Sequence, residues 1–150
     1  MIEPESIGFL IAETARLQRS VFEKRIATAG FELTPGEARA LLNIGHRSGC
    51  RQNEIAEKMG VEPMTMSGYI DKLETLGLVE RLPDPTDRRA RNVVMTPKAE
   101  PILREIRGLA KDLLAEMLTE ISENDREALD NALKAVKTSL LRLAADRDTE

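Results

Sequence analysis

The sequence predicts a mainly α protein of the α+β type, with one β-hairpin and the element order α-α-α-α-β-β-α-α. Apolar residues recur three and four positions apart over most of the chain, which is the period of an amphipathic helix. Only 3% of the residues are aromatic and tryptophan is absent, so the core must consist of Leu, Ile, Val, Ala and Met, which favours packing of helix against helix. Two β-prone segments flank a stretch of prolines and aspartates, which favours a hairpin.

The N-terminal segment is predicted to form two helices. An apolar stripe of helical period extends over residues 6–28 and ends at Ala29-Gly30. The next helix is predicted to begin after Thr34 and to end near Gly45. Thr34 is a suitable N-cap, a proline follows at the first helical position, and Glu37 can bond back to the cap.

Two further helices are predicted in the middle of the chain. Residues 46–50 form a turn, and residues 52–59 form a short helix that ends at Gly60. Pro63 begins the fourth helix, which Gly77 terminates. Apolar positions on this helix lie within about 100° of one another, so this face is expected to be buried. The face consists of Met66, Tyr69, Ile70 and Leu73.

The hairpin and two long helices complete the chain. Residues 78–82 and 91–95 are the predicted strands, and Pro83-Asp84-Pro85-Thr86-Asp87 forms a long tip between them. Thr96-Pro97 and Ser122-Glu123-Asn124-Asp125 are predicted helix starts. The stripe of the fifth helix contains Leu103, Ile106, Ala110, Leu113, Met117 and Ile121, and that of the sixth contains Leu129, Leu133, Val136, Leu140 and Leu143.

The outer helices are expected to pair with a second copy of the chain. Their apolar stripes lie outside the compact middle, and a long helix with an unpartnered apolar face is not stable alone. We therefore predict a compact central domain over residues 34–96 and a helical dimerisation region formed by residues 1–33 and 97–150. The protein is predicted to be a homodimer.

Charge is distributed unevenly along the chain. The net charge is −4, and the excess of acidic residues lies in the C-terminal third. The segment from Arg81 to Arg91 contains four arginines and two aspartates, so a local basic region remains where a nucleic acid would need it.

Residues 52–95 follow the order helix, turn, helix, hairpin, which is a winged helix-turn-helix, so the central domain over residues 34–96 is predicted to bind DNA. The second helix of such a motif enters the major groove, and arginines at the hairpin suit the minor groove. The predicted contacts on the helix are Pro63, Met64, Thr65, Ser67, Gly68, Asp71 and Lys72, and those on the wing are Asp87, Arg88, Arg89 and Arg91. Asp71 accepts a bond from cytosine or orients an arginine, and Asp87 is expected to position one guanidinium.

The run GLVERLPDPTDRRARNVVMT, residues 77–96, resembles the wing signature of the MarR family of transcription regulators, and the preceding MTMSGYIDKLETLG resembles the recognition helix of that family. The resemblance implies a ligand-responsive homodimeric repressor that binds a palindromic operator in double-stranded DNA. It also implies a small phenolic or other aromatic effector, bound where the dimer helices meet the DNA-binding lobe. Gly68 departs from the family pattern, because many relatives have a larger, often basic side chain at this position.

Two alternative functions remain open from the sequence. One is a winged-helix protein-interaction module that does not bind DNA. The other is a thiol-based redox sensor that uses Cys50, whose pKa Arg47 and Arg51 would lower.

Other functional classes lack their residues. One histidine, His46, and one cysteine are too few for a metal site, and no nucleophilic triad, glycine-rich phosphate loop or zinc spacing is present. We therefore expect no enzymatic activity, no metal and no cofactor.

The chain has no run of 18 apolar residues, it begins without a signal-peptide pattern, and its lone cysteine suits a reducing compartment, so we expect a cytoplasmic protein with no membrane association.

Overall fold

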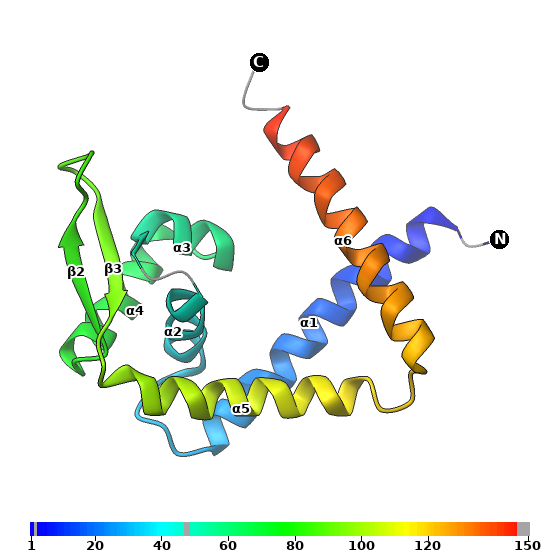
Figure 1. Ribbon diagram of the computed structural model, residues 1–150, viewed down its shortest axis with the longest axis horizontal. Coiled ribbons are helices and arrows are strands. Elements are labelled where there is room, and N and C mark those ends of the chain that lie inside the picture. Colours follow the sequence, from blue (N-terminus) through cyan, green and yellow to red (C-terminus); the bar gives the residue numbers. More distant parts are fainter. Residues whose placement is uncertain (2, 47–48, 147–150) are drawn as a thin grey trace. The chain divides into compact units, whose positions relative to one another are not determined.

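The structure is a computed structural model that describes residues 1, 3–46 and 49–146. The chain forms two compact units, Met1–Asp112 and Leu113–Glu150. The predicted fold class is confirmed, with one additional short strand (Figure 1). The elements are α1 (Pro4–Thr28), α2 (Pro35–His46), β1 (Cys50–Arg51), α3 (Gln52–Met59), α4 (Pro63–Thr75), β2 (Val79–Pro83), β3 (Arg91–Met95), α5 (Ala99–Met117) and α6 (Glu123–Ala145).

Local signals set the helix boundaries. At the start of α2, the Thr34 backbone N–H donates to Glu37 Oε2 at 2.9 Å and the Glu37 backbone N–H donates to Thr34 Oγ1 at 3.3 Å, which is the predicted reciprocal capping box. Gly60 ends α3 in the left-handed region at φ 63°, a conformation that is costly for any residue with a Cβ. Gly77 has φ 73° between α4 and β2. The predicted ends of α3 and α4 therefore agree with the structure to within two residues.

The core of the first unit lies where α2, α3 and α4 meet. Met66, Ile70 and Leu73 of α4 are all 0% exposed, as their spacing predicts. Tyr69, predicted on the same face, is only half-buried. Its ring lies over the start of α2, against Gly36 rather than within the core. Burial of the other three side chains stabilises the fold by roughly 1.5–3 kcal/mol each.

A three-stranded antiparallel sheet with the order β1-β3-β2 packs beside these helices. The hairpin pairs Val79 with Met95 and Pro83 with Arg91, so β2 is an edge strand. The strand β1 was not predicted. It contains only two residues, Cys50 and Arg51, which is too short for any alternation of polar and apolar residues to be visible, and it forms because Cys50 pairs with Val93.

Helix α5 packs on α2 through a close approach at Gly45. A Cβ at this position would lie 2.7 Å from Leu103 Cδ2, and Arg107 Nη2 donates to the Gly45 carbonyl at 3.3 Å. Leu103 and Ile106 are both fully buried. The helix ends at Met117, so Ile121, predicted on its stripe, lies beyond it and is 38% exposed.

Helices α1 and α6 carry most of the exposed apolar residues. The Ser122 hydroxyl caps α6 as predicted, accepting from the Asp125 backbone N–H at 3.2 Å. No residue of α6 is buried. None of the described helices combines the length and the apolar character needed to cross a membrane. The exposed side chains are Ile7, Phe9, Leu10, Ile11, Leu17 and Val21 on α1, and Leu129, Leu133, Val136, Leu140, Leu141 and Leu143 on α6.

The contact between Gly36 and Tyr69 yields a stability prediction. A Cβ at Gly36 would overlap the Tyr69 hydroxyl and lie 2.9 Å from Cε1, so Gly36→Ala forces the ring or α2 to move. We expect the free energy of unfolding to fall by about 1–3 kcal/mol, measured by urea denaturation at fixed protein concentration. Gly68→Ala is the matched control, because a Cβ there meets nothing within 4 Å and alanine favours a helix by about 1 kcal/mol. An equal gain in stability for both variants would contradict the close packing.

Candidate nucleic-acid interface

The turn at Gly60 directs α4 across α3 with its N-terminus open to solvent. Glu62, the N-cap residue, makes no side-chain capping bond, and Pro63 occupies the first turn. The backbone N–H groups of Met64 and Thr65 precede the first intrahelical donor and are therefore available to an anion. The Met64 side chain is 88% exposed.

The seven residues predicted to contact DNA all lie on the solvent side of α4. Six of them are exposed and Ser67 is half-buried. At 100° per residue, Thr65, Gly68 and Lys72 lie farthest from β2, with Met64 next to them. Pro63, Ser67 and Asp71 lie nearer to β2, and the side chains of Ser67, Asp71 and Glu74 contact Arg81 of that strand. Asp71 lies only about 20° around the helix from Met64, so its carboxylate borders the exposed face.

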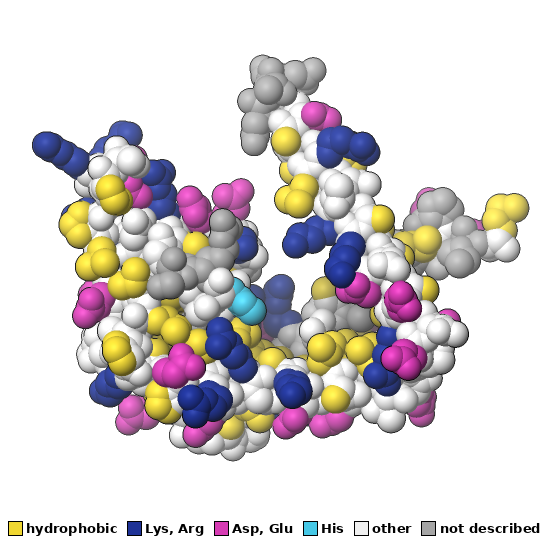
Figure 2. Space-filling model, in the orientation of Figure 1, with side chains coloured by type: hydrophobic (Ala, Val, Ile, Leu, Met, Phe, Trp, Pro, Cys, Tyr) yellow, Lys and Arg dark blue, Asp and Glu magenta, His cyan; other side chains and the backbone are white. Residues whose placement is uncertain are grey.

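The wing, formed by β2, β3 and the loop between them, carries exposed arginines at its tip. Figure 2 shows Lys and Arg side chains projecting at this end of the hairpin. The Arg89 side chain is 92% exposed, and Arg88 and Arg91 are exposed as well. Asp87 Oδ1 accepts from the Arg89 backbone N–H at 2.9 Å and lies 3.5 Å from its Nε. Arg91 Nη1 folds back onto the Arg88 carbonyl at 3.3 Å.

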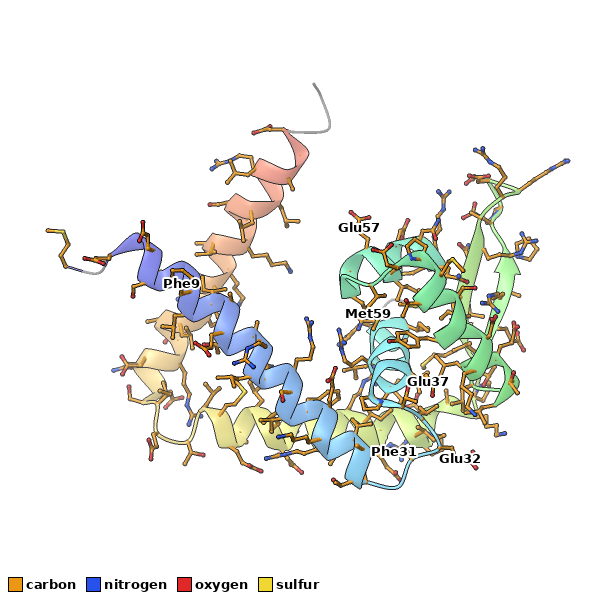
Figure 3. The ribbon with its side chains drawn as sticks, turned by 180° about the vertical axis from the view of Figure 1, so that it is seen from behind. Phe9, Phe31, Glu32, Glu37, Glu57 and Met59 are labelled. Carbon is orange, nitrogen blue, oxygen red and sulfur yellow. The ribbon has the colours of Figure 1, made fainter. Side chains whose placement is uncertain are left out.

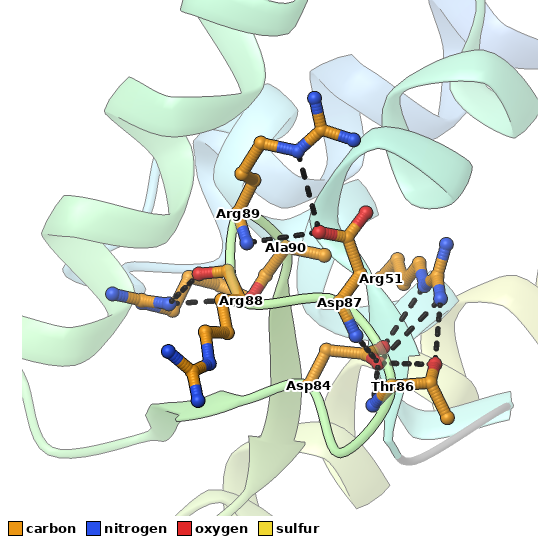
Figure 4. A network of polar contacts seen from close by, with 8 residues as sticks. Arg51, Asp84, Thr86, Asp87, Arg88, Arg89 and Ala90 are labelled. Atoms are coloured by element: carbon orange, nitrogen blue, oxygen red, sulfur yellow. Dashed lines mark hydrogen bonds and ion pairs between the residues drawn. The ribbon is translucent and has the colours of Figure 1, made fainter.

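Asp84 organises the wing tip, a role that was not predicted (Figure 4). Its Oδ1 accepts from the Thr86 backbone N–H and hydroxyl, both at 2.8 Å, and from the Asp87 backbone N–H at 3.0 Å. Its Oδ2 accepts from Arg51 Nε at 2.9 Å, which connects the tip to β1. These bonds hold the pKa of the Asp84 carboxyl well below its usual range, chiefly through the two donors of Thr86 and then Arg51.

Arg81 of β2 joins the hairpin to α4, and it too was not predicted as a site residue. Arg81 and the four residues that its guanidinium contacts form the Arg81 cluster. These four residues are Gln52, Ser67, Asp71 and Glu74. The Arg81 guanidinium contacts Gln52 Oε1 at 3.0 Å, the Ser67 carbonyl at 3.1 Å, the Ser67 hydroxyl at 3.5 Å, Asp71 Oδ1 at 2.7 Å and Glu74 Oε1 at 3.2 Å.

A hollow of about 540 Å³ separates α3 from the wing. Charges of both signs line it, so the hollow itself is not a basic channel. The charged lining residues are Arg51, Glu54, Glu57, Asp87, Arg89 and Arg91.

Cys50 is half-buried in β1 and is a free thiol. Arg51, which was expected to lower the pKa of this thiol, is instead bonded to Asp84, and Arg47 lies outside the described residues. Among residues 1, 3–46 and 49–146, no three His, Cys, Asp or Glu side chains gather in a way that could hold a metal ion.

Comparison with known proteins places this arrangement in a family. A family model described as MarR matches residues 33–90, the segment that contains the two helices and most of the wing. A crystal structure of the transcriptional regulator PA3341 is similar over 91% of this chain and 98% of its own, with 32% identity and a TM-score of 0.74. This chain belongs to the MarR family. It is therefore a transcription regulator of the DNA-binding class, and membership confirms that it is not an enzyme.

Other MarR structures share the fold at lower identity. A MarR transcriptional regulator from Methanosarcina mazei Go1 matches 93% of this chain and 99% of its own, with 22% identity and a TM-score of 0.79. Apo wild-type MarR from E. coli matches 91% of this chain and 98% of its own, with 23% identity and a TM-score of 0.73. The likeness to MarR structures thus extends over more than nine-tenths of this chain and is not confined to the winged helix-turn-helix.

The depressed pKa of Asp84 makes the regulator's stability depend on pH in a defined direction. The folded state favours the ionised carboxylate of Asp84, which therefore contributes to the free energy of unfolding. This contribution is complete above the ordinary pKa of about 4, and it is lost as the pH falls from there toward the lower pKa of Asp84 in the folded protein. We expect Asp84→Asn to lower the free energy of unfolding at pH 7, and the deficit to shrink at pH 3.5. Urea denaturation at both pH values measures it.

Asp112→Asn on α5 is the control, because this carboxylate is exposed and lies far along the chain from the wing. A deficit for Asp84→Asn that is equal at pH 7 and pH 3.5 would show that the bonds to Thr86 and Arg51 do not stabilise the ionised form.

Proposed function

We propose that this MarR-family protein is a ligand-responsive homodimeric repressor that binds a palindromic operator. Each subunit places α4 in a major groove and its wing arginines in the adjacent minor groove. The observation that carries the proposal is that α4 has an open N-terminus and an exposed face whose Asp71 carboxylate is paired with Arg81, and that the neighbouring hairpin carries exposed arginines at its tip. The proposed contacts are Pro63, Met64, Thr65, Ser67, Gly68 and Lys72 on α4, and Asp87, Arg88, Arg89 and Arg91 on the wing. Asp71 belongs to the same interface, either through a base or through the arginine that it orients.

The two elements have different tasks in this proposal. Helix α4 offers a thioether, hydroxyls and a glycine, which suit thymine methyls and close approach to the backbone, and Lys72 is its only exposed cation. The wing supplies most of the charge. An arginine on a narrow tip suits the minor groove of A·T-rich DNA, where the negative potential is strongest.

The exposed apolar stripes of α1 and α6 support the homodimer. A helix of 23 residues with no buried side chain gains nothing from packing within its own chain, and its Leu and Val side chains remain in water. A second copy presents the same stripes, so a two-fold interface buries both sets at once. The same symmetry places two copies of α4 about one helical turn of DNA apart, roughly 34 Å.

A pocket at the base of the DNA-binding lobe supports the effector. It has a volume of about 240 Å³ and lies between the loop that precedes α2, the end of α4 and the start of α5. Phe31 and Glu32, labelled in Figure 3, lie at its edge. Most of its lining is apolar, and Glu32 and Lys98 add one charge of each sign. The pocket therefore suits a single aromatic ring whose carboxylate pairs with Lys98. The remaining lining residues are Leu33, Leu76, Leu78 and Ile102.

DNA binding is tested by selecting bound duplexes from random sequences with the purified protein. We expect an inverted repeat with half-sites about one turn apart and A·T-rich steps where the wings lie. Affinity for the selected duplex should fall by roughly 10³ to 10⁵ between 50 and 200 mM salt if the dimer contacts about six to ten phosphates. Arg89→Ala should abolish the mobility shift at physiological salt.

Arg104→Ala on α5 is the matched control, since it removes one exposed positive charge away from the wing. An Arg89→Ala variant that binds as the parent does, or a protein that selects no sequence, would instead favour a winged-helix module that recruits other proteins.

The effector is tested with salicylate, a small phenolic acid, added to the complex with the selected duplex. We expect salicylate to release the DNA, and fluorescence anisotropy of the labelled duplex measures this release. The Lys98→Gln variant should require more salicylate for half of the DNA to be released. Lys111→Gln, an exposed position on α5, is the control and should respond as the parent does. Equal salicylate requirements for Lys98→Gln and the parent would exclude this pocket as the site.

A further inference from the structure

The Arg81 side chain is held by other groups of the protein on all sides of its guanidinium. Of its five N–H groups, four donate hydrogen bonds, to Gln52, Glu74 and the carbonyl and hydroxyl of Ser67, and Nη1 also forms an ion pair with Asp71. Nε donates to α3 through Gln52, while the two terminal nitrogens donate to α4. The side chain is only 19% exposed, so these bonds are partly shielded from water. Such a side chain is bonded mainly to its own protein rather than held out toward a phosphate.

The cluster also joins the edge strand to α4 through the main chain. Glu74 Oε2 accepts from the Arg81 backbone N–H at 3.3 Å, while Oε1 of the same carboxylate accepts from its guanidinium. Because β2 lies at the edge of the sheet, this N–H has no partner strand. Backbone and side chain of one residue thus bond to two successive turns of α4.

We infer that Arg81 is a positioning residue that sets the angle between α4 and the wing, and thereby the sequence specificity of the regulator, without touching DNA. The inference rests on the proposed function, because it assigns a role within that interface. Base contacts require side chains to be held to about 0.5 Å, and α4 must meet the major groove while the wing meets the minor groove. Arg81 is the residue that links the two elements directly.

The same contacts assign a supporting role to Asp71. Its Oδ1 lies 2.7 Å from Arg81 Nη1, the shortest contact of the cluster. The ion pair offsets the carboxylates of Asp71 and Glu74, which would otherwise repel phosphates from this side of the helix. Of the two roles that the sequence left open for Asp71, the geometry favours the orientation of an arginine over the acceptance of a bond from cytosine.

Lysine cannot replace this arginine. An ammonium group is compact and has three donors, whereas the planar guanidinium contacts α3 and both turns of α4 at the same time. The Arg81→Lys variant therefore retains the positive charge and loses most of the contacts with α3 and α4. Comparing it with the parent distinguishes a role in positioning α4 from a role in electrostatic attraction alone.

The experiment compares two probes: the duplex recovered most often with the unsubstituted protein, and a scrambled duplex of the same length and composition. We expect Arg81→Lys to reduce the ratio of the two affinities by about tenfold or more, as the loss of one or more good base contacts does. Its affinity for the scrambled duplex and the salt dependence should match those of the parent, because the charge is retained. Arg104→Lys is the control and should leave the ratio unchanged.

A second variant decides the case if Arg81→Lys proves unfolded by thermal melting. Asp71→Asn changes an exposed side chain and removes the ion pair, so it should lower the affinity ratio and broaden the selected sequence across the whole half-site. A changed preference at one base pair alone would identify Asp71 as a base contact and overturn the inference.

The remaining outcomes separate this inference from the proposed function. A folded Arg81→Lys variant with an unchanged ratio overturns the inference alone. An Arg81→Gln variant whose salt slope falls by about one per subunit would show a phosphate contact, and it also overturns the inference. An unsubstituted protein that binds neither duplex overturns the proposed function, and the inference with it.

Discussion

Burial of one apolar face of α4 controls the remainder of the interface. Met66, Ile70 and Leu73 are completely enclosed by α2 and α3, and this fixes the rotation of the helix about its own axis. The opposite face must then point outward, whatever residues it contains. A rotation of one residue, 100°, would place Ser67 or Asp71 in the core, where an unpaired carboxylate is far too costly.

Positive and negative charges lie on different elements of this protein, and the net charge of the chain hides this separation. The chain as a whole is acidic, and α4 itself is close to neutral because Arg81 offsets the carboxylates on its β2 side. The positive charge extends from the wing tip, where Arg89 is almost fully in solvent. In the proposed complex, the exposed arginines of the wing supply most of the attraction to DNA, while α4 contributes Lys72 and the close approach that Gly68 allows.

Two networks of hydrogen bonds and ion pairs, which share no residue, hold the wing in place. Asp84 closes the loop on itself and connects it to Arg51, while Arg81 connects the lower part of the hairpin to α3 and α4. The strand β1 is part of this arrangement, because it places Arg51 beside the loop. Both networks consist of charge-assisted bonds at the edge of solvent, where such bonds are strong enough to orient side chains and weak enough to rearrange.

The helices, their order and their buried faces followed from the amino-acid sequence, because the interactions that set them are local. The capping box of Thr34 and Glu37 spans three residues, and the left-handed glycines at positions 60 and 77 need only their own backbone. The winged helix-turn-helix pattern likewise lies in one continuous segment, and the helical period and the hairpin arginines within it identified the candidate DNA contacts.

The hydrogen-bond partners of Arg51 and Arg81 could not be predicted from local patterns in the sequence. Arg51 bonds to Asp84 across 33 residues, and Arg81 bonds to Gln52 across 29, so no periodicity or motif joins them. Ser67, Asp71 and Glu74 do lie four and three residues apart, which marks one side of a helix, but a polar helix side is ordinarily solvated. Only the packing of β2 against α4 brings an arginine to that side, because pairing between distant segments depends on how the hairpin crosses the helices.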